Sequence, residues 1–386
     1  MTKDLDENKT LYIRLLTELR QQILDGRYPK GSRLPSEAEL SDAYSVSRGT
    51  VRHALGILTQ EGLIERRKGS GSYVRANKGS EPNDGLSFSK QIGLVLSQSS
   101  DQLNMEILIG VEQGAKARGY HVIFSYAEEN ADQQRRDIQR LIADAVDGLI
   151  VFPVTEAPAY EGLTQLRANG IPFVLLDRYF PDFDSDYVVA NNYDGAYRAT
   201  EHLLILGYRR IAFIYAQLSS EMVTSIHDRW AGYRAALEHY GLSYDDRLVY
   251  RSPIRGQYDE FLALIGKEDA SGARSVKIPL SNHTLPDAIF AVNDLEALAI
   301  LKTSQRFGLR IPEDIALVGF DDLSFAAHLH PPLTTVAQLR MELGLRAVNV
   351  LIDRIEGATG PYKHIELPTR LVVRESCGAR LKIQPT

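Results

Sequence analysis

The stretch LSDAYSVSRGTVRHALGILTQEGLIERRKGSGSYV, residues 40–74, decides the fold of the first part of this chain. Apolar residues recur at helical spacing within VRHALGIL, and two short strand-like runs follow, separated by a basic turn rich in glycine. Just upstream, Ser36 and Glu39 have the spacing of a capping box, which predicts a short helix that ends near Tyr44. The predicted order is therefore helix, turn, helix and hairpin.

The second of these helices carries polar and cationic side chains near its N-terminus. Ser45 or Ser47 can cap it, and Arg48, Arg52 and His53 are expected on the side opposite the apolar stripe. A solvated helix face would also carry arginines, but here the cap, the turn, the helix and the basic hairpin occur together in order. The N-terminal end of such a helix fits into a major groove about 12 Å wide, where arginine can donate two hydrogen bonds to guanine. The pattern therefore predicts a winged helix-turn-helix that binds double-stranded DNA.

The stretch from Leu34 to Val74 resembles the GntR family of winged-helix regulators at almost every position. Gly49 departs from the bulkier residues that are often found at its position in the family, which leaves one base contact open. Since one such domain spans few base pairs, we expect a homodimer on two half-sites of an operator. The resemblance implies that the following residues contact DNA: Ser47, Arg48, Thr50 and Arg52 of the second helix, and Lys68 and Gly69 of the wing.

A polar segment divides the chain. NKGSEPNDGLSFS, residues 77–89, is rich in Gly, Ser, Asn, Asp and Pro and lacks apolar periodicity, which is typical of a flexible tether. We therefore expect a DNA-binding head at residues 1–77, a linker at 78–90 and a body at 91–386. The head holds 13 Lys and Arg against 10 Asp and Glu, whereas the whole chain has a net charge of -6. The head is thus the part suited to a polyanion.

The body alternates strand-like apolar runs with helical patterns. The runs QIGLVL, HVIFSY, GLIVF and PFVLLD are separated by helical segments, and the rhythm restarts at YVVANN and continues through RIAFIYA, AIFAVN and IALVGFD. Such alternation predicts parallel sheets that are covered on both faces. The expected fold class is therefore α/β, with an N-terminal winged helix-turn-helix followed by two doubly wound lobes in tandem.

Polar residues follow several of the predicted strands. In doubly wound sheets, ligands bind beyond the carboxyl ends of the strands. Asp177 and Asp321 end two such strands and are expected to face a ligand, whereas Asp194, Asp294 and Asp322 are expected to cap the helices that follow. Acids, an amide, an arginine and aromatic rings together suit a neutral polyhydroxylated ligand, because its hydroxyls need both donors and acceptors.

From about Gln91 to Arg374 the body resembles the LacI/GalR effector domain, which is akin to type I periplasmic sugar-binding proteins. The phrases GIPFVLLDR, DRWAGYRAAL, PDAIFAVND and PPLTTVAQ lie in the family's order. We expect Arg229 at the start of its helix, and Phe325 and Trp230 are candidate stacking surfaces, of which Trp230 is expected in the core. The resemblance implies the following effector contacts: Ser97, Asp177, Arg229, Asn293, Asp321 and Gln338.

A GntR-type head on a LacI/GalR-type body resembles the arabinose repressors. This pairing implies a dimeric repressor of sugar-utilisation genes, which a small sugar releases from operator DNA. Two alternatives stay open on the sequence alone. One is a nucleoside- or purine-responsive regulator that uses its ligand as a corepressor, and the other is a sugar-binding protein without a role at DNA.

Enzymatic and membrane functions are not expected. The sequence has no G-x-x-x-x-G-K-[ST] loop, no G-x-S-x-G elbow and no H-E-x-x-H pair. His328 and His330 lack metal-ligand context, and we expect neither a metal nor a cofactor. The polar start MTKDLDENKT and the strand-length apolar runs favour a cytoplasmic protein without a membrane span. The single cysteine, Cys377, is expected to be an inert thiol in a reducing compartment.

Overall fold

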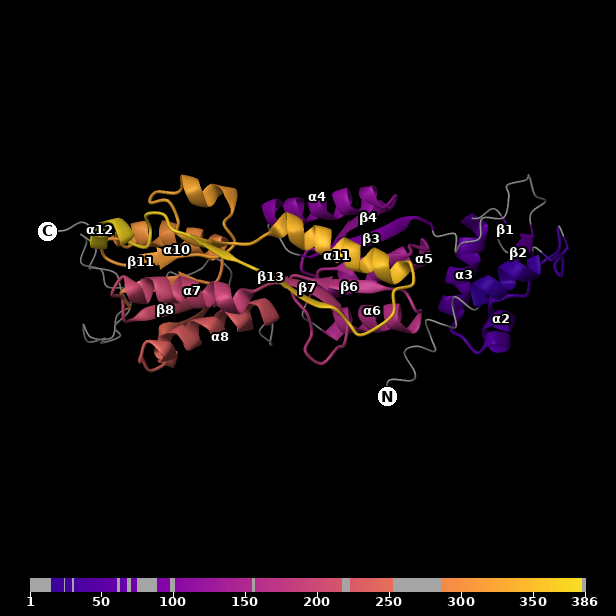
Figure 1. The fold of residues 1–386 in the computed structure, drawn as a ribbon, viewed down its shortest axis with the longest axis horizontal. Coiled ribbons are helices and arrows are strands. Elements are labelled where there is room, and N and C mark those ends of the chain that lie inside the picture. The colour runs from indigo at the N-terminus through magenta and orange to yellow at the C-terminus, as the bar shows by residue number, and fades with distance from the viewer. Residues whose placement is uncertain are drawn as a thin grey trace.

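The computed structural model forms an elongated molecule, with the head at one end and the two lobes of the body following it (Figure 1). The linker expected at 78–90 lies outside the described residues, apart from Ser89 and Lys90. In the part of the chain that is described, no helix is both long enough and apolar enough to cross a membrane. The structure describes residues 15–23, 25–29, 31–60, 63–67, 71–74, 89–97, 101–154, 157–216, 223–252 and 286–383.

The head has the predicted helix-turn-helix and hairpin. Ser36 Oγ accepts a hydrogen bond from the Glu39 N–H at 3.2 Å, and the Glu39 carboxylate accepts one from the Ser36 N–H at 2.7 Å, so the capping box is confirmed. The two strands pair antiparallel. The elements described in the head are a helical segment at residues 15–23, α2 (Glu37–Tyr44), α3 (Arg48–Gln60), β1 (Ile64–Arg67) and β2 (Gly71–Val74).

One side chain of α3 departs from the predicted pattern. His53, which we expected on the polar face, is only 3% exposed, and burial lowers its pKa to about 4. The physical reason is that α3 is the central helix of the head. The helical segment at residues 15–23, α2 and the hairpin all contribute to the core around it, so α3 buries a wider arc than a single apolar stripe.

The body has two lobes, each built on a sheet whose strand pairings among the described residues are all parallel. This confirms the α/β fold class. The strand order is β13-β7-β6-β5-β3-β4 in lobe 1 and β11-β10-β8-β9 in lobe 2. The strands are β3 (Gln91–Leu96), β4 (His121–Tyr126), β5 (Gly148–Val151), β6 (Phe173–Leu176), β7 (Asp186–Ala190), β8 (Ile211–Ala216), β9 (Val249–Ser252), β10 (Ala288–Ala291), β11 (Ala316–Val318) and β13 (His364–Leu367).

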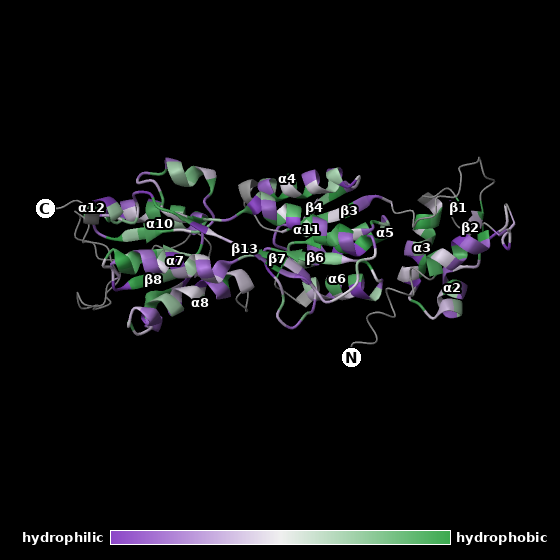
Figure 2. Cartoon of the chain, viewed as in Figure 1, coloured by the Kyte–Doolittle hydropathy of each residue, from purple (hydrophilic) through white to green (hydrophobic). Residues whose placement is uncertain are grey.

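Helices cover both faces of the two sheets. In lobe 1, one core cluster lies between the sheet and the pair α4 and α11, and another lies between the sheet and the pair α5 and α6. Figure 2 shows the strands as mainly hydrophobic, as expected for sheets buried on both faces. The helices are α4 (Asp101–Ala117), α5 (Ala131–Ala143), α6 (Ala157–Ala168) and α11 (Arg340–Ile355) in lobe 1, and α7 (Asn192–Ile205), α8 (Thr224–His239) and α10 (Asp294–Arg306) in lobe 2.

The lobes are not a simple tandem, and the prediction was wrong in this respect. The chain passes from lobe 1 to lobe 2 between β7 and α7, returns between β12 (Thr335–Ala337) and α11, and crosses again between β13 and β14 (Arg370–Val372). α11 and β13 therefore complete lobe 1 although they follow lobe 2 in the sequence. The apolar side chains of α11 belong to the core of lobe 1, which α4 and the sheet alone would leave open.

Candidate DNA-binding surface and effector pocket

The N-terminal end of α3 carries the residues expected at DNA. Ser47 is the cap, because its Oγ accepts a hydrogen bond from the Thr50 N–H at 3.1 Å. The side chains of Arg48 and Arg52 are exposed. Arg52 NH2 lies 2.9 Å from a carboxylate oxygen of Glu37 on α2, which holds the guanidinium on the outer surface of the helix pair. The arrangement presents cations beside the end of a helix that can enter a groove.

The other predicted DNA contacts have different positions. Thr50 is buried, and its hydroxyl lies 2.8 Å from Ser47 Oγ, so in this structure the side chain supports the cap. Lys68 and Gly69 lie outside the described residues. The strands on either side of them in the sequence pair Arg67 with Gly71.

The same end of α3 lies against the body. Ser47 Oγ donates a hydrogen bond to Asn169 Oδ1 at 3.3 Å, just after α6 of lobe 1. A Cβ added at Gly49 would lie 2.1 Å from that oxygen, so the missing side chain permits the approach. The contact therefore covers part of the helix end at which the sequence predicts DNA contacts.

A second candidate site lies between the lobes. A cavity of about 50 Å³ is lined from lobe 1 by Asp177 and Arg178, at the end of β6, and from lobe 2 by the remaining residues. Hollows of about 700 Å³ on the head and 370 Å³ on lobe 2 are larger, but the charged side chains that line them are exposed. The residues that lobe 2 contributes are Ala216, Ser225, Ile226, Arg229, Val292, Asn293, Glu296 and Asp321.

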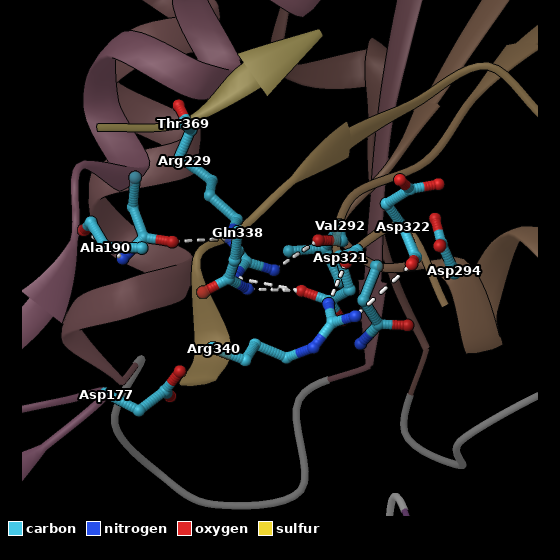
Figure 3. Close-up of polar contacts among 12 residues, drawn as sticks. Asp177, Ala190, Arg229, Val292, Asp294, Asp321, Asp322, Gln338, Arg340 and Thr369 are labelled. Atoms are coloured by element: carbon cyan, nitrogen blue, oxygen red, sulfur yellow. Dashed lines mark hydrogen bonds and ion pairs between the residues drawn. The ribbon is translucent and has the colours of Figure 1, made fainter. Parts of the chain in front are cut away.

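Arg229 is the centre of the polar network in this pocket (Figure 3). Its Nε donates to Asn192 Oδ1 at 2.8 Å, and its NH1 donates to the Val292 carbonyl at 2.6 Å. NH2 lies 3.5 Å from Asp321 Oδ1. The guanidinium also lies over the ring of Phe320, 3.7 Å from its centroid. These contacts fix the position of the Arg229 guanidinium, so little conformational entropy is lost when it donates a hydrogen bond to a ligand.

Arg229 does not begin its helix, contrary to the prediction. α8 starts at Thr224, so Arg229 lies in the second turn. The N-cap of α8 is Val223, which has no side chain that could accept a hydrogen bond. Without a polar cap there is no local signal in the sequence for where this helix begins.

Two buried aspartates face the pocket. Burial raises the pKa of the Asp177 carboxyl, against the influence of Arg178 and Arg229, and it raises the pKa of Asp321 against Arg229 and Arg340. Both residues have a positive φ, 67° for Asp177 and 116° for Asp321. Backbone in this region costs on the order of 1–3 kcal/mol and occurs preferentially at functional sites. The two strand ends thus place a carboxyl from each lobe at the cavity wall.

The remaining predicted effector residues surround this pair in different ways. Asn293 lines the cavity and also caps α10, because its Oδ1 accepts from the Glu296 N–H at 2.8 Å. Gln338 is buried and donates to Asp321 Oδ1 at 2.6 Å. Ser97 is buried as well, and its Oγ donates to the Phe152 carbonyl at 2.6 Å. The structure therefore brings four of the six residues to the cavity wall, and Gln338 contacts one of these four, Asp321.

The predicted helix caps at Asp194, Asp294 and Asp322 were wrong. Asn191 caps α7 and Asn293 caps α10, while the short helix η2 (Ser324–His328) has no side-chain cap. An asparagine earlier in the chain already occupies each of the two N-cap positions. Instead, the Asp194 carboxylate pairs with Arg198, and the Asp322 carboxylate pairs with Arg374. The Asp294 carboxylate accepts hydrogen bonds from the Thr335 hydroxyl and the Leu323 N–H.

The two candidate stacking residues do not line the described cavity. Trp230 packs against the core of lobe 2, with its ring centroid 6.0 Å from that of Tyr244, so its expected core position is confirmed. Phe325 packs against the core cluster of lobe 1. The sequence alone did not identify two residues of the pocket: Glu296, which lines the cavity, and Asn192, which accepts a hydrogen bond from Arg229. Asn192 directly follows a strand-end asparagine, and Glu296 stands three places after Asn293, so both positions had a signal in the sequence.

Comparisons with known proteins cover both parts of the chain. Residues 11–74 match the bacterial regulatory proteins of the gntR family, and residues 200–377 match the periplasmic binding protein-like domain. The chain is 28% identical to the arabinose metabolism transcriptional repressor of Geobacillus stearothermophilus, over 91% of this chain and 93% of that protein. It is 30% identical to the HTH-type transcriptional repressor PurR of Aliivibrio salmonicida, over 74% of this chain and 81% of that protein.

A solved structure described as the transcriptional regulator CelR–cellobiose complex superposes with a TM-score of 0.62 at 28% identity, over 92% of this chain and 94% of that one. Together, the winged helix and the two-lobed body define a DNA-binding transcriptional regulator with an effector domain. The chain belongs to the bacterial transcriptional repressors that join a GntR-type head to a LacI-type, periplasmic-binding-protein-like effector domain.

Proposed function

We propose that this protein is a dimeric repressor of sugar-utilisation genes that a small sugar releases from its operator. The observation that carries the proposal is the pocket, in which Asp177, Arg229 and Asp321 offer buried acceptors and donors from both lobes. Sugar hydroxyls need both kinds of partner. The similarity to an arabinose repressor and to a regulator solved with cellobiose supports a sugar as the effector.

The cavity of about 50 Å³ limits how a sugar can enter. A single water molecule has a share of about 30 Å³ in the liquid, so a monosaccharide needs considerably more room. The lobes must therefore separate to admit the ligand and then close on it. We assign the effector contacts to Ser97, Asp177, Arg229, Asn293, Asp321 and Gln338.

For DNA, we assign the contacts to Ser47, Arg48, Thr50, Arg52, Lys68 and Gly69. The exposed Arg48 and Arg52 support this assignment, because an arginine beside the end of a recognition helix can reach guanine edges or phosphates. Ser47 becomes available once the head leaves Asn169. Contacts to phosphates fix the register of the head, and contacts to bases give the specificity.

We propose a second copy of the chain as the partner of an exposed apolar face on lobe 1. Met105, which is 54% exposed, and Ile109 lie on α4, and Phe124 and Tyr126 lie on β4, which is an edge strand of its sheet. All four side chains are between 36% and 54% exposed. A second copy of the chain is the expected partner because the two half-sites of an operator require two heads. In a dimer with two-fold symmetry, the same face of each copy is buried in the interface.

The remaining features of the proposal follow from this role. We propose a head at residues 1–77, a linker at 78–90 and an effector and dimerisation body at 91–386. Because the relatives are regulators of transcription, we assign no catalytic role to the pocket. A protein that represses bacterial genes acts where the chromosome lies, so we propose the cytoplasm as its location.

A thermal-shift panel of L-arabinose, D-ribose, cellobiose, hypoxanthine and guanine tests the effector. A ligand present at a hundred times its Kd stabilises the native state by about 2.7 kcal/mol, which raises the Tm measurably. We expect a sugar to give the shift, and to weaken binding to a duplex that the protein has selected from random DNA. The similarity to PurR favours a purine corepressor as the second candidate. A purine that stabilises the protein and tightens DNA binding would replace the sugar proposal.

A further inference from the structure

We propose that Arg340 is a positioning residue that couples the effector pocket to α4, and through α4 to the apolar face of lobe 1. This inference rests on the proposed function and names how the pocket would regulate the heads. Arg340 is the first residue of α11, so it lies directly after the crossover from lobe 2 to lobe 1. Its side chain is only 5% exposed although it carries a charge. A buried guanidinium needs partners for its charge and its N–H groups.

On one side, Arg340 contacts the strand end of lobe 2 that carries Asp321. Its NH1 donates to the Asp321 carbonyl, and its NH2 donates to the Asp322 carbonyl at 3.3 Å (Figure 3). Asp321 and Asp322 have φ values of 116° and 52°, in the region that favours glycine. The segment is therefore strained and depends on external contacts to keep its conformation. Arg340 supplies such contacts from the other lobe.

On its other side, the guanidinium pairs with Glu106 of α4. Nε lies 2.9 Å from Oε2 and NH2 lies 3.2 Å from Oε1, so the pairing has two points. Two parallel hydrogen bonds fix the plane and the direction of a guanidinium, which a single ammonium cannot do. One side chain thus connects the strained strand end of lobe 2 to α4 of lobe 1.

α4 and α11 are locked together by close backbone contact. A Cβ at Gly110 of α4 would lie 2.0 Å from the Met341 carbonyl oxygen, and a Cβ at Gly344 of α11 would lie 2.3 Å from the Ile107 carbonyl oxygen. Only glycine permits this approach at both positions. Figure 1 shows the two helices side by side over lobe 1. A displacement at the start of α11 is therefore passed on to α4 as a whole.

The apolar face is directly linked to this helix pair. Met105 precedes Glu106 in α4, and Ile109 follows one turn later, so the residues proposed at the dimer interface move with the partner of Arg340. At the other end of the path, the Asp321 carboxylate accepts from Gln338 and lies 3.5 Å from Arg229 in the pocket. A ligand hydroxyl that binds this carboxylate changes the contacts of the same residue whose carbonyl holds Arg340.

The first test needs no ligand and uses the full chain. Asp321→Asn replaces one pocket carboxyl by an amide, and we expect it to change backbone hydrogen exchange at residues 106–112 of α4 by about threefold or more. In an Arg340→Met background this response should vanish. It should persist in Arg346→Met, a matched control on the same helix, where an exposed arginine pairs with Glu342 at 2.7 Å. The proposal is overturned if Asp321→Asn leaves hydrogen exchange in α4 unchanged in the parent background. It is also overturned if Asp321→Asn still changes this exchange in the Arg340→Met background.

The second test uses L-arabinose and the selected duplex. In Arg340→Met, the ratio of the DNA affinities without and with saturating L-arabinose should fall by about fivefold or more. Glu106→Gln should have the same effect without removing the arginine, which separates coupling from a folding defect. Unaltered release in both variants contradicts the coupling role. If L-arabinose does not release the parent, it is not the effector of this protein, and hydrogen exchange still decides the role of Arg340.

Discussion

The side-chain amide of Gln338 donates a 2.6 Å hydrogen bond to the carboxylate of Asp321. Gln338 lies at the crossover where the chain returns to lobe 1, and Asp321 lines the pocket at a strand end of lobe 2. Both side chains are buried, so the bond is protected from water. A ligand that competes for this carboxylate therefore acts directly on a segment that connects the lobes.

Replacing Asp321 by alanine should abolish the response to effector while the protein still binds operator. A ligand hydroxyl would lose a charged acceptor, and such hydrogen bonds contribute about 1.5–3 kcal/mol. Calorimetry with L-arabinose measures the loss. Asp194→Ala is the matched control, because Asp194 pairs with Arg198 on the surface of lobe 2. Equal sugar affinity in Asp321→Ala and the parent would show that the pocket is misassigned.

Replacing Arg52 by alanine should weaken operator binding at fixed salt. The expected loss is about 1–3 kcal/mol if the guanidinium makes a bidentate contact to a base. The pair with Glu37 is exposed in the free protein, so breaking it costs little. Fluorescence anisotropy with a labelled duplex measures the affinity. Arg140→Ala, at an exposed position on α5, should bind as the parent does. An unchanged affinity in Arg52→Ala would remove this residue from the contacts.

Introducing acids on the apolar face of lobe 1 should separate the dimer. In Met105→Glu/Ile109→Glu, two carboxylates from each copy would be brought into a desolvated interface, where unpaired charges are strongly unfavourable. Sedimentation velocity should show a monomer, and affinity for a two-site operator should drop. Ile205→Glu, at an exposed apolar position on α7, is the control and should stay dimeric. A dimeric double variant would place the interface elsewhere.

The head should lose stability in mild acid because of His53. Burial lowers its pKa in the folded protein to about 4, whereas the unfolded value is about 6.5. As the pH falls from 6.5 to 4, the unfolded state takes up the proton first, so the free energy of unfolding falls by up to about 3 kcal/mol. Above pH 6.5 this loss is absent.

Urea titrations followed by the methyl NMR signals of Leu55 and Leu58 measure the stability of the head at each pH. His53→Leu should weaken the dependence between pH 6.5 and 4. His328→Leu, at an exposed position in η2, should leave it as in the parent. An identical pH dependence in His53→Leu and the parent would mean that this imidazole is not the group that titrates.

Local patterns in the sequence were sufficient for the elements and for much of the pocket. The capping box at Ser36 and Glu39, the periodicity of α3 and the strand ends at Asp177 and Asp321 were all identified from residues close together in the chain. They form as predicted because helix caps and the direction of strands depend on short-range hydrogen bonds and side-chain spacing. The comparison families could be suggested for the same reason.

The tertiary structure alone decided which distant segments complete each lobe. α11 returns to lobe 1 because its apolar face fills the core that α4 and the sheet leave open. The alternation of strands and helices in the sequence does not indicate which lobe a given helix joins. The return places Arg340 between Asp321, which is 19 residues away in the sequence, and Glu106, which is 234 residues away. Burial of His53 has the same origin, because it depends on how many elements surround α3. Sequence spacing fixes local hydrogen bonds, whereas long-range packing is settled by which apolar surfaces remain to be covered.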